Sequence, residues 1–346
     1  MSEKIRALGL LSGGLDSTLS ARILQEQDIE VLGLHFSTGF CVADRHRLIG
    51  NTNNPDKPYR NEALRAGADL EIPVELIDIK DEYLPKVLLN PKYGYGQGMN
   101  PCIDCRIFML QKAKGIMEER GYHFVFTGEV LGQRPMSQRR QPMDNVTGNS
   151  GLEGYLLRPL SAKLLPPTIP EERGWVDREK LYGISGRSRK EQMELAEKLG
   201  VVDYPQPAGG CCFLPDKNYA RKLRDFLTFR GTDVTHDDMM MLKVGRHFRL
   251  SDDVKVIVGR DESENNYLER FKQGRGQVWI DEFPSPLTLI EGQASARDLE
   301  LACSITARYS DGREHESVPV KWRIEDSEGQ LRVAPVDDEA LEEMRI

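Results

Sequence analysis

The first half of the chain alternates short apolar runs with amphipathic stretches. Apolar runs at residues 5–11, 30–37, 74–79 and 123–130 are typical of strands buried on both faces of a parallel sheet. The spacing of apolar residues indicates helices over 18–27 and 102–120, and shorter ones near 60–66 and 190–199. Strands that alternate with helices in this way predict an α/β domain with a parallel sheet.

The pattern changes after residue 219. A basic helix is expected over 219–230, and residues 242–250 and 254–260 show the period-two alternation of strands. Farther on we expect a strand at 277–280, a helix over 295–309, a hairpin at 319–335 and a short or frayed acidic helix at 337–346. The predicted parts are an α/β domain at 1–190, a cysteine-bearing loop and bridging helix at 191–235, and a smaller α+β domain at 236–346.

Length, charge and hydropathy narrow the class of protein. With 346 residues the chain is longer than a typical single domain. Its net charge of -8 means that any nucleic acid must be bound by local basic patches. No apolar run approaches the length of a membrane span, and the first strand begins too early to leave room for a signal peptide. We therefore expect a cytoplasmic protein with no membrane partner.

Residues 12–17 (SGGLDS) lie between the first strand and the first helix. Such a junction offers free backbone N–H groups and the positive end of a helix dipole, which together bind phosphate. Gly13 and Gly14 let the backbone approach an anion, and the hydroxyl groups of Ser12 and Ser17 add donors. The turn lacks the lysine of a Walker loop, and a plain helix-capping turn is the alternative.

The SGGLDS motif resembles the PP-loop of the N-type ATP pyrophosphatases. The resemblance implies an adenine nucleotide α-hydrolase-like fold that binds ATP and Mg²⁺, cleaves ATP between its α and β phosphates, and adenylates an acceptor oxygen. Asp16 would hold Mg²⁺ or orient the loop. His35, near the end of the second strand, would face adenine or ribose, with core packing as the alternative.

Four of the six cysteines are clustered. Cys102 and Cys105 lie in the first turn of an expected helix, where a thiol is favoured as its thiolate. Cys211 and Cys212 lie in a loop rich in proline and glycine. In a reducing compartment, clustered cysteines indicate a metal site or catalysis more often than disulfides. Two isolated cysteines are expected to be packing residues, namely Cys41 and Cys303.

Three segments resemble tRNA thiouridine synthetases. T-G-E-V-L-G-Q at 127–133 is similar to a motif of the tRNA 4-thiouridine synthetases. N-P-C-x-x-C at 100–105 is similar to the tRNA 2-thiouridine synthetases and to PP-loop thiolation enzymes that hold an iron–sulfur cluster. G-x-C-F at 210–213 resembles the loop that carries the second cysteine of the 2-thiouridine synthetases.

By this resemblance the chain is an ATP-dependent tRNA uridine sulfurtransferase, which adenylates a uracil oxygen and then replaces it with sulfur. Cys105 and Cys212 align with the two cysteines of the 2-thiouridine synthetases, and Gly128 and Gln133 would contact the nucleotide. The implied partners are tRNA and a sulfur donor, which is sulfide or a cysteine desulfurase relay. A homodimer is considered as well.

Three interpretations of the cysteines stay open. The favoured one is a [4Fe–4S] cluster on Cys102, Cys105 and either Cys211 or Cys212, with an open iron that carries hydrosulfide. In the second, no metal binds, and Cys105 attacks a persulfide on Cys212. In the third, all four bind a structural zinc, as in a PP-loop ligase that forms amides or nitriles. A desulfidase and a non-catalytic RNA-binding regulator are further alternatives, which the intact motifs disfavour.

Basic residues mark candidate RNA contacts. Arg134, Arg139 and Arg140 follow the fourth strand, and a second basic segment spans 184–189. The order of V-G-R-D-E-S-E-N-N-Y-L at 258–268, a strand containing tryptophan and a helix resembles the small RNA-binding module of the NFACT ribosome quality-control proteins. The contacts implied by that resemblance are Arg260 and Asn265, with a basic rim of Lys243, Arg246 and Arg249.

Overall fold

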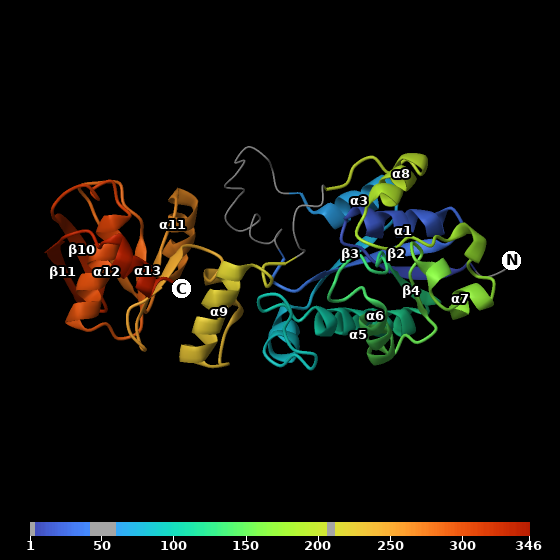
Figure 1. The fold of residues 1–346 in the computed structure, drawn as a ribbon, viewed down its shortest axis with the longest axis horizontal. Helices are drawn as coiled ribbons and strands as arrows, with labels where there is room; N and C mark the ends of the chain where they lie inside the picture. Colours follow the sequence, from blue (N-terminus) through green and yellow to red (C-terminus); the bar gives the residue numbers. More distant parts are fainter. Residues whose placement is uncertain (1–3, 42–59, 206–211) are drawn as a thin grey trace. The chain divides into compact units, whose positions relative to one another are not determined.

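The computed structural model describes residues 4–41, 60–205 and 212–346. These residues fall into two compact units (Figure 1). One contains residues 4–41, 60–205 and Cys212, and the other contains residues 213–346. The division lies directly after Cys212, whereas the sequence predicts boundaries at 190 and 235 with a separate bridging part between them.

The first unit is built on a parallel sheet with the strand order β3-β2-β1-β4-β5. The strands are β1 (Arg6–Leu10), β2 (Glu30–Ser37), β3 (Val74–Asp78), β4 (Phe124–Thr127) and β5 (Leu156–Leu157). The apolar runs form the central strands because both of their faces are covered, and Leu8 and Phe126 are fully buried there. The predicted parallel sheet is confirmed, and the two-residue β5 is an addition.

Helices cover both faces of this sheet (Figure 1). On one face lie α1 (Leu15–Gln25), α3 (Glu62–Leu70) and α8 (Lys190–Lys198), and on the other lie α5 (Cys102–Arg120) and α6 (Arg140–Ser150). Shorter helical segments are α4 (Lys80–Tyr83), the π-helix η1 (Leu84–Leu88), η2 (Ala162–Leu164), α7 (Ile169–Glu172) and η3 (Arg178–Lys180). A π-helical turn is rare and is frequently found at functional sites, and this one directly follows Tyr83.

The second unit is an antiparallel sheet with the order β11-β10-β8-β9-β7-β6. Its strands are β6 (Arg246–Arg249), β7 (Lys255–Val258), β8 (Gly276–Trp279), β9 (Thr288–Glu291), β10 (Val318–Ile324) and β11 (Ser327–Val333). Its helices are α9 (Lys217–Arg230), α10 (His236–Met241), α11 (Glu262–Leu268), η4 (Glu269–Phe271), α12 (Ala296–Arg308) and α13 (Asp338–Met344). The predicted α+β class is confirmed, because α12 packs its apolar face on the sheet.

Within the part of the chain that the structure describes, no helix is both long and apolar enough to cross a membrane.

Candidate nucleotide and cysteine site

The SGGLDS loop leaves the carboxyl end of β1, the central strand, and enters α1. Gly14 is the N-cap of α1, and a glycine has no side chain with which to bind the first N–H groups of the helix. The hydroxyl groups of Ser17 and Thr18 both donate to the Gly14 carbonyl oxygen, at 3.0 Å. The Ser12 and Ser17 oxygens lie 3.2 Å apart. The helix start thus keeps the free N–H groups that an anion needs.

Two glycines place the loop among its neighbours. Gly13 has a φ of 76°, and a Cβ atom on it would overlap the backbone of Glu62 at the start of α3. A Cβ on Gly128 would overlap the backbone of Asp16 and Ser17 at the start of α1. The expected contact of Gly128 with the nucleotide stays a prediction, and the close approach of β4's end to α1 by itself requires that this residue has no side chain.

Only one of the two carboxylate oxygens of Asp16 accepts hydrogen bonds from the described residues. Its Oδ2 accepts hydrogen bonds from Gln133 Nε2 at 2.8 Å and from Arg189 Nη2 at 3.1 Å. Its Oδ1 is buried and accepts no hydrogen bond from any described residue. A carboxylate oxygen beside a phosphate-binding loop is the kind of ligand that Mg²⁺ takes, so the residues present fit that ion. Arg189, expected among RNA contacts, is therefore engaged inside this site.

His35 and Gln133 both lie beside the loop. His35 Nδ1 is 3.0 Å from the carbonyl oxygen of Leu11, the residue that precedes the loop. Gln133 donates to Asp16 and also accepts from Gln192 Nε2 at 3.4 Å. Their contact with adenine, ribose or phosphate stays a prediction, and their observed bonds hold the surroundings of the loop in place.

One buried tyrosine interacts with three cysteines. Tyr83, at the end of α4, is only 2% exposed and packs against the rings of Phe40 and Phe108. Its hydroxyl group hydrogen-bonds with the thiol of Cys105 and lies within the electrostatic reach of Cys212 and Cys102. Burial raises the pKa of Tyr83 well above its ordinary value, and the neighbouring thiols raise it further. The tyrosine therefore stays protonated, and its O–H group can donate a hydrogen bond to a thiolate.

Cys212 is held by a segment that continues β2. It pairs through an isolated antiparallel bridge with Cys41, and the Cys41 sulfur lies 4.0 Å from the Thr38 hydroxyl oxygen. Cys41 was expected only to pack, and its place opposite Cys212 is a finding that the sequence did not indicate. The second expected packing residue, Cys303, is buried in the core of the other unit.

The cysteines do not form a metal site in the described part of the chain. No three side chains of His, Cys, Asp or Glu converge there as ligands, although Cys102, Cys105 and Cys212 all belong to it. Cys211 lies outside the described residues. The expected [4Fe–4S] cluster and the alternative zinc site therefore lack support from the thiols that are described.

Glu129 connects the cysteine helix to the nucleotide loop. Its carboxylate lies 3.2 Å from Arg106 Nε, next to Cys105 on α5, and 3.0 Å from Arg158 Nε. Burial alone would raise the pKa of Glu129, but the two guanidinium groups and Thr127 hold it below its ordinary value. The carboxylate is thus charged, and it follows Gly128, which touches α1. Glu129 was not expected to be a site residue, and the signal that could have indicated it is a carboxylate placed at the end of an apolar strand.

In the second unit, several expected RNA contacts are engaged internally. Arg260 Nε lies 3.0 Å from a carboxylate oxygen of Glu264, and Asn265 Oδ1 accepts from the Leu287 N–H at 3.0 Å. The three residues of the expected basic rim are also buried or paired. Lys243 is only 5% exposed, Arg249 forms an ion pair with Asp225, and Arg246 lies over the ring of Tyr309. In the first unit, Arg134, Arg139 and Arg140 are exposed.

Two family matches agree with the two sequence resemblances. Residues 5–165 match the tRNA methyl transferase HUP domain, and residues 245–345 match the NFACT protein RNA binding domain. Similar curated proteins are the tRNA-specific 2-thiouridylases MnmA of Listeria monocytogenes serotype 4b and of Thiobacillus denitrificans. The first is 24% identical over 278 residues, which are 75% of this chain and 70% of the relative. The second is 23% identical over 356 aligned residues, which cover 91% of this chain and 92% of the relative.

Among solved structures, a 4-thiouridine synthetase–RNA complex with bound ATP aligns at 19% identity and a TM-score of 0.33, over 57% of this chain and 51% of the other. A predicted subunit of tRNA methyltransferase from Methanocaldococcus jannaschii aligns at 15% identity and a TM-score of 0.30, over 45% and 69%. The two resemblances drawn from the sequence are confirmed by the family matches. The chain is thus similar to the tRNA methyl transferase HUP domain over residues 5–165 and to the NFACT protein RNA binding domain over residues 245–345.

Proposed function

We propose that the protein is an ATP-dependent tRNA uridine sulfurtransferase. The observation that carries the proposal is that one unit holds the SGGLDS loop and two thiols that act on the same buried tyrosine: Cys105 hydrogen-bonds with Tyr83, and Cys212 acts on it electrostatically. A nucleotide loop and a pair of thiols are what a reaction needs that first activates an oxygen and then replaces it with sulfur. The 2-thiouridylases to which the chain is similar are named for that outcome.

ATP is placed with its phosphates at the start of α1. The uracil carbonyl oxygen attacks the α-phosphorus, the bond to the bridging oxygen breaks, and pyrophosphate leaves. The N–H groups of the helix start stabilise the charge that grows on the phosphates. Mg²⁺, held by Asp16 Oδ1, would offset part of the phosphate charge. The adenylated base then carries AMP, a far better leaving group than an oxide ion.

Sulfur is delivered by the two cysteines. Cys212 carries a persulfide loaded by the sulfur donor, and the Cys105 thiolate attacks its inner sulfur. A Cys105–Cys212 disulfide forms and hydrosulfide is released, which attacks the activated carbon and expels AMP. An external thiol reductant restores the two cysteines. The Tyr83 hydroxyl group, which bonds to Cys105, stabilises the thiolate before attack. No step is derived through an iron–sulfur cluster, because the described thiols do not converge as ligands.

The C-terminal unit is proposed to bind the tRNA, in keeping with the description of its family. The exposed arginines Arg134, Arg139 and Arg140 would add phosphate contacts beside the catalytic unit. In this route the sulfur donor is a cysteine desulfurase relay, which transfers sulfur already at the persulfide level; sulfide alone would need a two-electron oxidant to load the reduced Cys212. A homodimer stays a prediction.

The test is a reconstituted reaction of the full chain with unmodified tRNA, Mg²⁺-ATP, a persulfide donor and a thiol reductant. We expect AMP and pyrophosphate in equal amounts, and thiouridine in the digested tRNA by mass spectrometry. Cys105→Ser and Cys212→Ser should abolish thiouridine while pyrophosphate release continues. Absence of tRNA-dependent AMP formation with the wild-type chain would contradict the proposal, and the mass and absorbance of the product distinguish a 2-thio from a 4-thio base.

A further inference from the structure

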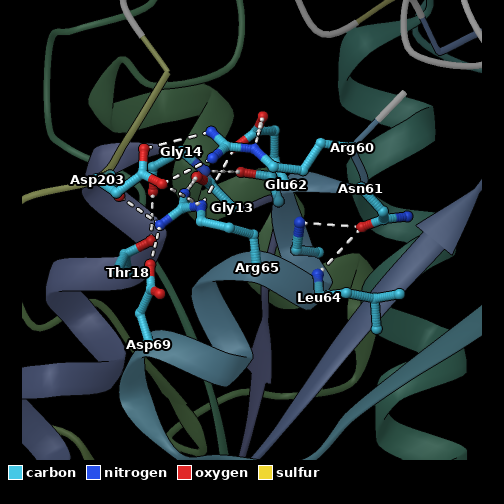
Figure 2. A network of polar contacts seen from close by, with 12 residues as sticks. Gly13, Gly14, Thr18, Arg60, Asn61, Glu62, Leu64, Arg65, Asp69 and Asp203 are labelled. Atoms are coloured by element: carbon cyan, nitrogen blue, oxygen red, sulfur yellow. Dashed lines mark hydrogen bonds and ion pairs between the residues drawn. The ribbon is translucent and has the colours of Figure 1, made fainter. Parts of the chain in front are cut away.

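We propose that Arg65 is a positioning residue that orients the Gly13–Gly14 peptide for phosphate and fastens the loop to the backbone of Asp203. This inference rests on the proposed function insofar as it takes the SGGLDS loop to be the ATP site. Figure 2 shows the polar network around Arg65. The guanidinium group comes from α3, and its side chain is only 8% exposed.

Arg65 binds the loop through a backbone carbonyl group. Its Nη2 donates to the Gly13 carbonyl oxygen at 2.8 Å. The C=O and N–H of a trans peptide point in opposite directions, so fixing the Gly13 oxygen also fixes the direction of the Gly14 N–H. That N–H donates to the Ser12 hydroxyl oxygen at 3.4 Å, where the loop meets the start of α1. Arg65 therefore sets the direction of one N–H donor of the loop, which an anion would take over from the Ser12 hydroxyl group, without touching the anion itself.

The base of α3 is fixed, which makes Arg65 a rigid support. Asn61 caps the helix by accepting the N–H groups of Ala63 and Leu64 at 3.0 and 3.1 Å (Figure 2). The Gly13 backbone packs so closely on Glu62 that only a glycine fits there. The loop and the first turn of α3 thus move together, and the arginine reaches the carbonyl group from a fixed position.

The charge of Arg65 is balanced by its neighbours. Asp69 lies 2.7 Å from Nη1, Glu62 lies 3.3 Å from Nε, and the Asp203 carboxylate lies 3.9 Å from Nε. The negative charges of these carboxylates offset the positive charge of the guanidinium group, so its attraction for a phosphate is weak. We therefore infer that Arg65 acts on the loop and does not bind the phosphate directly. Its planar fork of donors can bind the loop and the acidic residues at once, a geometry that a lysine ammonium group does not reproduce.

The same guanidinium group also binds Asp203, near the end of the described stretch that follows α8. Arg65 Nη1 donates to the Asp203 carbonyl oxygen, and Arg60 pairs with the Asp203 carboxylate at 2.7 Å (Figure 2). Asp203 lies in the stretch that leads along the chain to Cys212. One side chain thus bonds both to the loop proposed for ATP and to Asp203, which lies in the described stretch after α8.

The experiment measures ATP binding to the full chain by calorimetry without tRNA, and the KM and kcat of pyrophosphate release with tRNA. The variants are Arg65→Met and Arg65→Lys, with Arg60→Met as the matched control, because Arg60 binds Asp203 and Glu62 but not the loop. We expect Arg65→Met to raise the Kd and KM for ATP about tenfold, Arg65→Lys to restore less than half of that loss, and Arg60→Met to stay within about twofold.

Circular dichroism and thermal unfolding confirm that each variant is folded, and if Arg65→Met is not, the lysine variant, which keeps the charge, carries the comparison. Wild-type binding of ATP together with unchanged affinity in the folded Arg65 variants would overturn the inference. An equal loss of affinity in Arg60→Met would overturn the role of the Gly13 contact. Failure of the wild-type chain to bind ATP would instead contradict the proposed function, so the two failures are distinguishable.

Discussion

The Tyr83 hydroxyl group hydrogen-bonds with the Cys105 thiol at a position almost closed to water. The ring is held by Phe40 and Phe108, so its oxygen is aimed by packing. A buried donor that keeps its proton stabilises a thiolate next to it more than a water molecule would, because the surrounding dielectric is low.

Tyr83→Phe should separate the two half-reactions. The ring and its packing stay, and only the hydroxyl group is lost, so we expect sulfur transfer to slow about tenfold, equivalent to one charge-assisted hydrogen bond, while AMP-forming activation is unchanged. Thiouridine and pyrophosphate are measured in single turnovers. Tyr95→Phe is the matched control, since that hydroxyl group bonds only to the Leu88 carbonyl oxygen among the described residues. Equal thiouridine rates in both variants would argue against a role for Tyr83.

Glu129→Gln should destabilise the first unit. The change leaves the guanidinium groups of Arg106 and Arg158 without their shared carboxylate, which costs about 3 kcal/mol for a buried network. The folded pKa of Glu129 is depressed, so its contribution is full above the unfolded value of about 4.3 and is lost as pH falls through the folded value.

Chemical denaturation from pH 3 to pH 8 provides the measurement for Glu129. The difference in unfolding free energy between wild type and variant should be constant near neutrality and shrink below about pH 4. Glu75→Gln, which removes an exposed pair with Arg120, is the control and should cost less than about 1 kcal/mol. A variant as stable as the wild type at neutral pH would show that Glu129 does not join these elements.

Lys222 should make the stability of the second unit rise with pH, in a window different from that of Glu129. Burial lowers its pKa to about 7, with a further contribution from Arg260, and its ammonium group donates to the Gly245 carbonyl oxygen at 2.9 Å. Between pH 7 and about 10.4 the unfolded chain binds the proton that the folded chain has released, so this lysine makes stability rise with pH across that window.

Lys222→Met removes that proton linkage. The melting temperature of the wild type relative to the variant should rise from pH 7 to pH 10 and stay level below pH 6. The exposed Lys217→Met, on the same helix, should run parallel to the wild type across the whole range. A wild-type curve parallel to that of Lys222→Met would show that Lys222 has an ordinary pKa.

The sulfur route is tested by metal content and by single cysteine changes. After anaerobic purification we expect far less than one iron or zinc per chain, and we expect Cys102→Ser to retain thiouridine formation, because only Cys105 and Cys212 act in the proposed transfer. About four iron and four sulfide per chain, with loss of both in Cys102→Ser, would restore the cluster interpretation. That measurement also includes Cys211, which lies outside the described residues.

The sequence predicted those elements that are determined by residues close together in the chain. Apolar runs mark β1, β2 and β4 because both faces of these strands are covered, and the glycines of SGGLDS mark a backbone that must approach its neighbours. The two-residue β5 lies in a segment too short to carry a periodic pattern. Helix α1 begins at Leu15, earlier than expected, since the loop itself supplies its first turn.

The contacts of the site could not be predicted in the same way. From the sequence, Arg189 was expected to be an exposed basic residue. Its ion pair with Asp16 forms only because α8 packs beside α1. Tyr83 and Cys105 come from separate helices, and nothing near Tyr83 in the sequence indicates a thiol partner. Such pairs depend on tertiary geometry, which a single sequence does not contain.

Gly13 and Gly128 have a consequence for the entropy of nucleotide binding. Each lies against another backbone segment with no room for even a methyl group, so the SGGLDS loop is clamped between the start of α3 and the end of β4. A clamped loop has already lost its conformational freedom when the protein folds. ATP therefore meets donors that are preorganised, and the cost of ordering them falls on the stability of the fold and not on the affinity for the nucleotide.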